Sequence, residues 1–326
     1  MTTSRDERAR PVVDVGVVTW NTADLTATSL RKMLDSDQGV DIRLLVRDNA
    51  SSDGTVDRLT RDVPEAEVDA GAENLGFAGG VNTLIRRSTA PWFFVLNSDA
   101  WPLEGTIGRL VRGAELHPRA AAIVPRIEYP DGQLQHSTHP FPSLRVAANV
   151  AFRRDRLTPE RADELFLEGA WQHDRPRQVD WAYGAAMLIP RAALDAVGGF
   201  DERFFFYAED LEWCWRAHTL GLDIWFEPSA VVHHMENASG EQLYASVRTR
   251  AHMRNSLRFY RRAHGTPSAA AWWSLNVAGG VVRFAQAVGR RDRADATVWR
   301  RFLRAQVESV FVRERRPGGP IAQEDG

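Results

Sequence analysis

The sequence predicts an α/β fold in which a mostly parallel central sheet is flanked by helices. In the first hundred residues, apolar stretches alternate three times with stretches of helical pattern. Such strand–helix units build parallel sheets with right-handed crossovers. The stretches Val12–Trp20 and Trp92–Leu96 are almost continuously apolar, as strands buried on both faces are. From about Glu241 the pattern is helical and rich in arginine. We therefore expect a disordered tail over 1–11, an α/β domain over 12–240 and a helical C-terminal region over 241–326.

Each element of the first half follows from a local pattern. After the strand Val12–Trp20, residues 21–24 supply helix-capping types, and a helical pattern runs to about Leu34. The next predicted elements are a strand over 42–46 that ends at Asp48, a helix over 55–62, a weak strand near Val68, a helix opened by the glycine-rich stretch 74–82 and the strand 92–96. Ligands of open α/β sheets bind beyond the carboxyl ends of the strands. Asn21, Asp48 and Asp99 follow such ends and form a candidate constellation.

The second half is less regular. A helix is expected over about 104–116 and a strand over 121–127, followed by an irregular stretch, 128–178, that we interpret as a mobile insertion near the site. The remaining predicted elements are a strand over 181–189, a turn at 198–201, a helix over 209–220 and two short strands over 223–226 and 230–232, the second ending in His233-His234.

Composition excludes several classes of protein. The net charge of -2 and the isoelectric point near 6.5 argue against a strongly basic nucleic-acid binder. Cys214 is the one cysteine, so neither an intrachain disulfide nor a cysteine-rich zinc site can form. Lys32 is the one lysine, and no Walker-type phosphate loop surrounds it. A reducing, cytoplasmic setting fits best, since residues 1–11 lack the apolar core of a signal peptide and no run of about 18 apolar residues occurs.

Two loops have the composition of a nucleotide site. Residues 48–55 place acceptors and turn formers after a strand, where the carboxylate of Asp48 can accept the imide N–H of uracil or thymine. An ordinary loop with a capped helix is the alternative. Residues 74–82 contain three glycines, which let a backbone approach a nucleotide or sugar closely. The spacing is not that of a dinucleotide fingerprint, and a tight turn remains the alternative.

The stretch Asn97-Ser98-Asp99 presents one carboxylate after a buried strand. Mg²⁺ and Mn²⁺ prefer oxygen ligands, often one or two carboxylates together with substrate phosphates. His233 or His234 could add an imidazole, which suits Mn²⁺ better than Mg²⁺. Neighbouring residues of a strand point to opposite faces, so we expect at most one of the two histidines to face a metal. A structural histidine is the alternative.

Four consecutive aromatic residues, 204–207, lead into the acids Glu209 and Asp210. Aromatic walls lower the local dielectric constant and can raise the pKa of a carboxylate toward that of a useful base. The alternative is a core turn followed by acids at a helix start, where carboxylates favour the helix dipole.

These stretches together resemble family 2 glycosyltransferases of the GT-A fold. The resemblance extends over roughly Val12–Ser239 and rests on the order of VVTWN, DNASSDGT, NLGFAGGVN, LNSDA, GAAMLIPR, GGFDERFFFYAEDLEWCWRAHTLG and VVHH. It looks closest to the bacterial rhamnosyltransferase-like branch. The resemblance implies an inverting transferase that moves a sugar from a UDP- or dTDP-sugar to a hydroxyl of a glycan or lipid-linked acceptor. Rhamnose is one candidate for the sugar, and Mg²⁺ or Mn²⁺ is the implied cofactor.

The resemblance also implies roles for individual residues. Thr19, Asn21 and Asp48 would hold the nucleoside, Asn74, Gly80 and Asn82 would line the donor site, Asp99 with either His233 or His234 would bind the metal, and Asp210 would be the base. The family's D-x-D appears here as Asn97-Ser98-Asp99, so one carboxylate is missing, although an asparagine at the first position is compatible with ribose binding.

Two alternatives to a transferase come from other classes of protein. A sugar nucleotidyltransferase needs a glycine-rich loop with basic residues near the first strand, and VVTWN offers none. A non-catalytic nucleotide-sugar binding protein would keep the first half without needing Asp210.

The C-terminal region suggests peripheral contact with the inner face of the plasma membrane or with a partner. It combines the arginines 248, 250, 254, 258, 261 and 262 with Trp272 and Trp273. A helical cap on the α/β domain is the alternative, and a homo-oligomer is compatible with the sequence.

Overall fold

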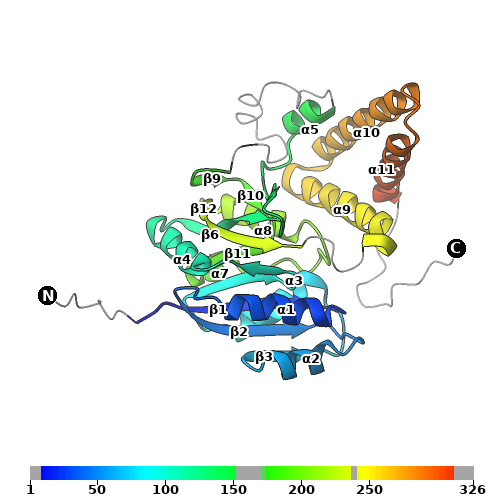
Figure 1. Ribbon diagram of the computed structural model, residues 1–326. Coiled ribbons are helices and arrows are strands. Elements are labelled where there is room, and N and C mark those ends of the chain that lie inside the picture. Colours follow the sequence, from blue (N-terminus) through cyan, green and yellow to red (C-terminus); the bar gives the residue numbers. More distant parts are fainter. Residues whose placement is uncertain (1–8, 152–170, 172, 236–240, 312–326) are drawn as a thin grey trace.

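A computed structural model describes residues 9–151, 171, 173–235 and 241–311 of the chain (Figure 1). A central sheet with helices on both faces forms one part, and a group of long C-terminal helices forms the other. The predicted disordered tail is described only from Ala9 onward. Its end is attached to the fold, since Arg10 forms an ion pair with Asp37 and the carbonyl of Pro11 accepts the N–H of Asp41.

The predicted parallel strands are confirmed. Strands β1 (Val12–Thr19), β2 (Asp41–Asp48), β3 (Ala66–Ala70) and β4 (Trp92–Asn97) lie in the order β3-β2-β1-β4, and each pair is parallel. Thr19 is aligned with Asp48, and Val18 with Asn97. The polar residues that follow these strands therefore meet at one edge of the sheet.

The other half of the sheet is mixed. Strand β11 (Ala186–Pro190) lies antiparallel between β4 and β6 (Ala120–Glu128). Strand β12 (Asp223–His234) is parallel to β6 and antiparallel to β5 (Ala100–Pro102) and β9 (Arg177–Val179). Short strand β7 (Leu134–Gln135) pairs with β6, and β10 (Trp181–Ala182) pairs with β8 (Thr138–His139) outside the main sheet.

Two strand predictions were wrong in detail. The stretch 181–189 is divided into β10 and β11, and residues 183–185, which include Gly184, belong to neither strand. The two strands expected at 223–226 and 230–232 are one continuous strand, β12, whose register shifts between Glu227 and Val231. That shift surrounds Pro228, which has no N–H to give to a sheet and is tolerated at such irregularities.

Helices cover both faces of the sheet. They are α1 (Ala23–Leu34), α2 (Thr55–Asp62), α3 (Gly76–Arg87), α4 (Thr106–Leu116), α7 (Arg191–Val197) and α8 (Glu209–Thr219). Strand β4 contributes to both cores, because successive side chains alternate between faces. Phe94 packs in the hydrophobic core on the face covered by α1 and α4, whereas Phe93 packs in the core on the face covered by α3 and α8. This explains why the strand reads as a continuous apolar run.

The stretch 128–178, expected to be irregular, contains a helix in its described part. Helix α5 (Leu144–Ala151) packs on the C-terminal helix α10 (Thr266–Gly289). The two backbones come so close that a Cβ on Gly279 would lie 2.8 Å from Cα of Ala151. Residues 152–170 and 172, in which the prediction of mobility also falls, lie outside the described residues.

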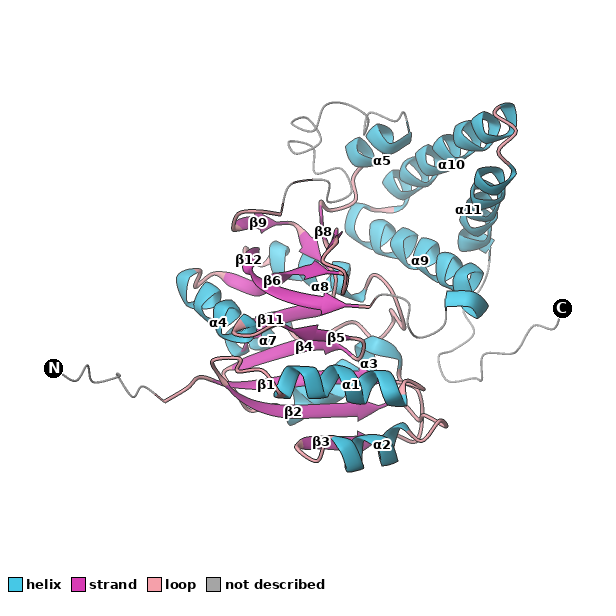
Figure 2. Ribbon diagram, viewed as in Figure 1, coloured by secondary structure: helices cyan, strands magenta, loops and turns pink. Residues whose placement is uncertain are grey.

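The predicted helical C-terminal region is confirmed: α9 (Glu241–His264), α10 and α11 (Arg293–Phe311) are long helices (Figure 2). The interpretation of Trp272 as membrane-facing was wrong, because this side chain is buried, whereas Trp273 is half-buried. Trp272 is only 9% exposed and stacks on Tyr260, and Trp273 donates its indole N–H to the carbonyl of Gln306. In the part of the chain that the structure describes, no helix combines the length and apolarity needed to cross a bilayer.

Candidate active site

Asp48 ends strand β2, and one of its carboxylate oxygens has no hydrogen-bond partner within the described chain. The residue is 2% exposed, and its Oδ2 accepts the N–H of Ser51 over 2.9 Å. Its Oδ1 is buried and has no hydrogen-bond partner within the described chain. A buried acceptor without a partner is unfavourable unless a ligand supplies a donor. The geometry therefore agrees with the expectation that this carboxylate accepts an N–H group.

Asn21 shapes the loops beside Asp48. Its Oδ1 accepts the N–H of Ser52 over 2.8 Å, and its own N–H donates to Oγ of Ser51 over 2.8 Å. Asn21 and Ala50 both have a left-handed backbone, with φ of 51° and 60°. Such conformations in residues other than glycine persist where the surrounding structure over-determines them, often at functional sites. The loops after β1 and β2 are thus locked together around the end of the sheet.

Thr19 lies at the expected edge, but its hydroxyl is already engaged. The Oγ1 atom lies 2.8 Å from that of Thr22 and 2.9 Å from that of Thr26, and the residue is 1% exposed. A side-chain contact from Thr19 to a nucleoside stays a prediction that this buried threonine cluster does not favour.

The glycine-rich stretch opens α3, as predicted, with its glycines in the first turns of the helix. A Cβ on Gly76, whose φ is +70°, would lie 2.3 Å from the carbonyl oxygen of Phe205, and one on Gly80 would lie 2.8 Å from Val18. Asn74 accepts the N–H of Gly76 over 2.9 Å. The glycines therefore let the start of α3 approach both β1 and the aromatic stretch before Asp210.

Asn82 faces the turn before the aromatic stretch. Its Nδ2 donates to the carbonyl of Phe200 over 2.8 Å, and its Oδ1 accepts the N–H of the same residue over 2.8 Å. Both ends of the amide are thus used, and Asn82 holds the turn rather than presenting its amide to a ligand.

His234, and not His233, lies beside Asp99. Nε2 of His234 is 3.1 Å from Oδ1 of Asp99 and 3.3 Å from Nδ2 of Asn97. His233 points away, toward Glu128 at 3.9 Å, with its ring edge on Trp101. The alternation along β12 thus decides a choice that the sequence left open.

Gln135, which sequence reasoning did not single out, fixes the tautomer of His234. Its Nε2 donates to the carbonyl of His234 over 2.6 Å, and its Oε1 lies 2.9 Å from Nδ1. A carbonyl only accepts, so this amide orientation is determined and Nδ1 must carry a proton. The other ring nitrogen, Nε2, is the one that faces Oδ1 of Asp99.

The pair of Asp99 and His234 fits a divalent cation. They bring a carboxylate oxygen and an imidazole nitrogen, both donor types that Mn²⁺ accepts, to within 3.1 Å of each other. No group of three His, Cys, Asp or Glu side chains that could hold a metal occurs among residues 9–151, 171, 173–235 and 241–311. These two residues would therefore share an ion with oxygen ligands from a substrate.

Asp210 lies in the first turn of α8 in a constrained position. Its Oδ2 accepts the N–H of Gly184 over 2.9 Å, and its Oδ1 accepts the N–H of Leu211 over 2.7 Å. Burial raises the pKa of Asp210 above its ordinary value, and these two N–H groups oppose that rise. The carboxylate is therefore both oriented and more basic than an exposed aspartate.

Glu209 is the more buried acid of the pair. It is 6% exposed, and its Oε2 has no hydrogen-bond partner within the described chain. Burial, and next the neighbouring charge of Asp210, raise the pKa of Glu209 well above its ordinary value. The two preceding residues, Tyr207 and Ala208, have left-handed φ angles of 71° and 68°.

The segment Gly184-Ala185 connects the two acidic stretches. Gly184 donates to Asp210, and the carbonyl of the next residue, Ala185, accepts the N–H of Asn97 over 2.9 Å. The carboxylate of Asp210 and the group of Asn97, Asp99 and His234 therefore flank one short piece of backbone. Gly184 begins the stretch GAAMLIPR, but the sequence gives it no role, because its contact with Asp210 is visible only in three dimensions.

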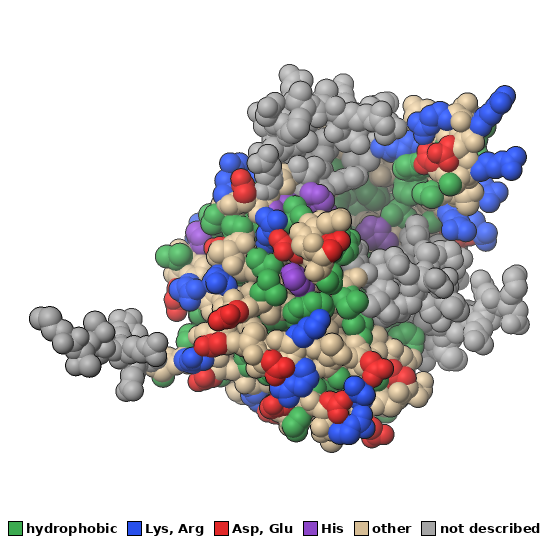
Figure 3. All heavy atoms as spheres, viewed as in Figure 1, with side chains coloured by type: hydrophobic (Ala, Val, Ile, Leu, Met, Phe, Trp, Pro, Cys, Tyr) green, Lys and Arg blue, Asp and Glu red, His purple; other side chains and the backbone are tan. Residues whose placement is uncertain are grey.

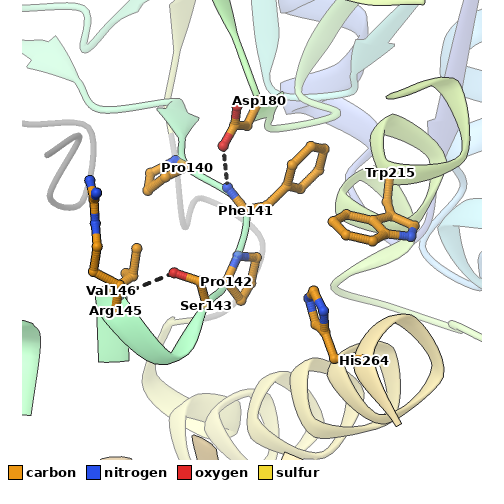
Figure 4. A pocket seen from close by; sticks show the side chains of 9 residues that line it. All are labelled: Pro140, Phe141, Pro142, Ser143, Arg145, Val146, Asp180, Trp215 and His264. Carbon is orange, nitrogen blue, oxygen red and sulfur yellow. Dashed lines mark hydrogen bonds between the residues drawn. The ribbon is translucent and has the colours of Figure 1, made fainter. Parts of the chain in front are cut away.

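A separate cavity of about 320 Å³ lies between the segment before α5, helix α8 and the end of α9 (Figure 4). Phe141, Trp215 and His264 point toward it, and Asp180 accepts the N–H of Phe141 over 2.7 Å. Trp215 follows Asp210 by five residues, which corresponds to about 140° around a helix. The cavity thus opens on a different face of α8 from the Asp210 carboxylate.

Comparisons with known proteins relate the chain to glycosyltransferases. The model of glycosyl transferase family 2 matches residues 14–169. An N-acetylglucosaminyl-diphospho-decaprenol L-rhamnosyltransferase of Mycobacterium tuberculosis is 28% identical over 258 residues, which cover 71% of this chain and 77% of the relative. A pre-mycofactocin glycosyltransferase of the same organism is 25% identical over 211 residues, 64% of this chain and 40% of the relative.

The fold is shared with solved glycosyltransferases. The mannosyltransferase PcManGT from Pyrobaculum calidifontis, solved with GDP-Man and Mn²⁺, superposes with a TM-score of 0.56 at 19% identity, over 93% of this chain and 88% of that one. GalNAc-T7, solved with UDP, GalNAc and Mn²⁺, gives a TM-score of 0.55 at 13% identity, over 78% of this chain and 48% of that one.

Proposed function

Because the chain belongs to glycosyl transferase family 2, in its rhamnosyltransferase-like branch and with the GT-A fold, we propose that it transfers a sugar from a nucleotide-diphosphate donor. The proposed acceptor is a hydroxyl of a glycan or of a lipid-linked molecule. The transfer would invert the configuration of the anomeric centre. The observation that carries the proposal is the short backbone segment Gly184-Ala185, which holds Asp210 on one side and Asn97 on the other. It joins a basic carboxylate to a pair of groups suited to a diphosphate-bound cation.

In the proposed reaction Asp210 is the general base. Its carboxylate would accept the proton of the acceptor hydroxyl while that oxygen attacks the anomeric carbon from the side opposite the diphosphate. The bond between the anomeric carbon and the diphosphate oxygen breaks, and the pair of electrons leaves with the nucleoside diphosphate. Burial supports this role because it raises the pKa of Asp210, and the N–H groups of Gly184 and Leu211 hold its two oxygens in one orientation.

Asp99 and His234 are proposed to hold Mg²⁺ or Mn²⁺ together with oxygens of the donor diphosphate. When bound, the ion would neutralise negative charge that develops on the leaving diphosphate. Nδ2 of Asn97 lies 3.3 Å from the same histidine nitrogen, and with an ion bound there this amide is proposed to contact the ribose or the diphosphate instead. Gln135 keeps the lone pair of His234 directed at this position, as outer partners of histidine ligands do.

The donor base is proposed to be uracil or thymine, bound at the unpartnered Oδ1 of Asp48. The imide N–H of either base would satisfy that oxygen, and Asn21 would keep the surrounding loops in place. Rhamnose is proposed as the sugar because the rhamnosyltransferase of Mycobacterium tuberculosis is a relative over most of its length. The name of that relative also supports a lipid-linked acceptor.

For a lipid-linked acceptor we propose peripheral contact with an anionic membrane through α10 and α11, in place of the tryptophans. One face of α10 is exposed and uncharged; it carries Ala271, Ala278, Val281, Val282, Ala285 and Val288. Arg290, Arg291 and Arg293 follow at the exposed turn into α11, where basic side chains gather in Figure 3. An apolar helix face bordered by arginines is complementary to an anionic headgroup layer.

A direct assay tests the proposed function. The purified chain would be incubated with UDP-, dTDP- and GDP-sugars and Mg²⁺ or Mn²⁺, and binding would be followed by thermal shift. Transfer to a polyprenyl-diphosphate-linked sugar would be followed by mass spectrometry. We expect stabilisation by a pyrimidine donor and a product heavier by one sugar. Stabilisation without either transfer or Asp210-dependent hydrolysis would favour the alternative, a nucleotide-sugar binding protein.

A further inference from the structure

Helix α9 lies against the segment that leads into Asp210. Phe204 and Ala208, which are 1% and 6% exposed, share a buried cluster with Phe259 and Tyr260 of α9. Helix α9 belongs to the C-terminal helical region, and the match to the family model ends at residue 169, before either segment. The contact joins two segments that lie more than 40 residues apart in the sequence, and it is visible only in the tertiary structure.

Three polar side chains on α9 contact this segment. Asn255, Arg258 and Arg262 are spaced by three and four residues, which places them on one helix face. Arg258 donates to the carbonyl of Arg203 over 2.9 Å, and Arg262 donates to Oδ2 of Asp201 over 2.6 Å. The face thus follows the segment from Asp201 toward the start of α8.

Asn255 makes the contact nearest to the acids. It is 3% exposed, and its Nδ2 donates to the carbonyl of Phe206 over 2.9 Å and to that of Tyr207 over 3.1 Å. An amide NH₂ has two hydrogens, so one side chain satisfies both carbonyls. These carbonyls lie next to the left-handed residues Tyr207 and Ala208, a conformation that other contacts must maintain.

We infer that Asn255 is a positioning residue for Asp210, and that α9 is thereby a working part of the active site. The inference rests on the proposed function for its catalytic consequence. By holding the carbonyls of Phe206 and Tyr207, Asn255 fixes the backbone that ends at Glu209, and so fixes where α8 presents the carboxylate of Asp210. Without these two bonds the segment can relax out of its left-handed conformation, and Asp210 moves relative to Gly184 and the donor.

The test compares Asn255→Asp with a matched control, Asn276→Asp. Asp keeps the shape of asparagine, but a carboxylate cannot donate to two carbonyls. Asn276 also lies in the C-terminal helices and donates from Nδ2 to a backbone carbonyl, that of Trp272, over 2.8 Å, but it is not bonded to the segment before Asp210. Both variants, with Asn255→Ala as a second change at the first position, would be measured as full-length chains.

We expect Asn255→Asp to lower kcat by about 10- to 100-fold, since small misplacements of reacting groups have effects of this size. The KM for the donor should stay within about twofold, and the pH at which kcat is half-maximal should shift. Asn276→Asp should keep kcat within about twofold of wild type. A kcat near that of wild type in both Asn255 variants, or a loss shared equally by Asn276→Asp, would overturn the inference.

Amide hydrogen exchange separates this inference from the proposed function. In Asn255→Asp, exchange should increase over residues 205–211 and stay unchanged in β1 to β4, whether or not transfer is observed. Unchanged exchange over 205–211 would overturn the inference even if the wild-type chain transfers sugar. Absence of transfer by the wild type, together with faster exchange in the variant, would overturn the proposed function and leave the contact standing.

Discussion

Gly184 donates its backbone N–H to Oδ2 of Asp210 over 2.9 Å, across 26 residues of sequence. A Cβ on Gly184 would lie 3.3 Å from the ring of Phe77 and 3.6 Å from Cβ of Asp210, so the approach leaves little space for a side chain. The next carbonyl, that of Ala185, accepts the N–H of Asn97. The relative position of Asp210, the proposed base, and of Asn97 beside the proposed cation-binding pair therefore depends on one piece of backbone between two strands.

The first prediction concerns Asp210 as the base. Asp210→Asn keeps the shape and removes the basicity, and it should lower kcat by about 10²–10⁴-fold, the usual contribution of a general base. Donor affinity, measured by calorimetry, should change little because Asp48, Asp99 and His234 are untouched. Glu209→Gln should be the milder change. An active Asp210→Asn beside an inactive Glu209→Gln would reverse the two roles.

The second prediction concerns metal-dependent donor binding through Asp99 and His234. Asp99→Ala and His234→Ala should each abolish the part of nucleoside-diphosphate affinity that depends on Mn²⁺, as titration calorimetry with and without Mn²⁺ would measure. His233→Ala is the matched control, because His233 points toward Glu128 and should leave this part intact. Equal losses in both histidine variants would contradict the geometry of β12.

The third prediction concerns pH and stability. The pKa of Glu209 in the folded chain is raised well above its ordinary value of 4.5, mainly by burial. The folded state therefore binds more protons than the unfolded state once the pH exceeds about 4.5, and stability falls as pH rises through the folded pKa. Glu209→Gln removes this group, so its melting temperature should fall less than that of wild type between pH 5 and pH 8. Parallel melting curves for the two proteins over that range would refute the effect.

The pKa of Asp210 gives a prediction of opposite sign for activity. A general base must be ionised, so kcat should rise with pH and level off above the pKa of Asp210. Because burial raises that pKa above 3.8, the acid limb of the pH profile should lie at higher pH than for an exposed aspartate. Initial rates at saturating donor would locate it, with circular dichroism at each pH as the control for folding.

The fifth prediction concerns the exposed face of α10. The double variant Val281→Asp, Val282→Asp should co-sediment less than wild type with vesicles of anionic phospholipid at low salt, because charge is unfavourable in the apolar boundary. Leu116→Asp, at a site 76% exposed on α4, is the control and should co-sediment like wild type. A concentration-dependent dimer that the double variant abolishes, with no vesicle binding by wild type, would show instead that a second copy covers this face.

The sequence by itself determined most elements of the first half and the edge of the sheet at which Asp48 and Asp99 lie. Val12–Trp20 and Trp92–Leu96 could be predicted as buried strands because burial on two faces demands continuous apolar residues, and Asp48 and Asp99 could be placed after strands for the same reason. The helix that begins at Glu209 also follows from local pattern. These features depend on residues that are close together in the chain, so the amino-acid sequence alone is enough to predict them.

Only the tertiary structure decided how those residues meet. The register of β12 after its irregularity turns His234 toward Asp99. Gln135, 99 residues away in the sequence, determines that the Nδ1 atom of His234 carries the proton. Packing of α9 and α10 buried Trp272, which composition alone had suggested for a surface, and brought Asn255 to the carbonyl of Tyr207. Such contacts join residues far apart in the chain, and their geometry depends on how whole elements pack, which no local pattern specifies.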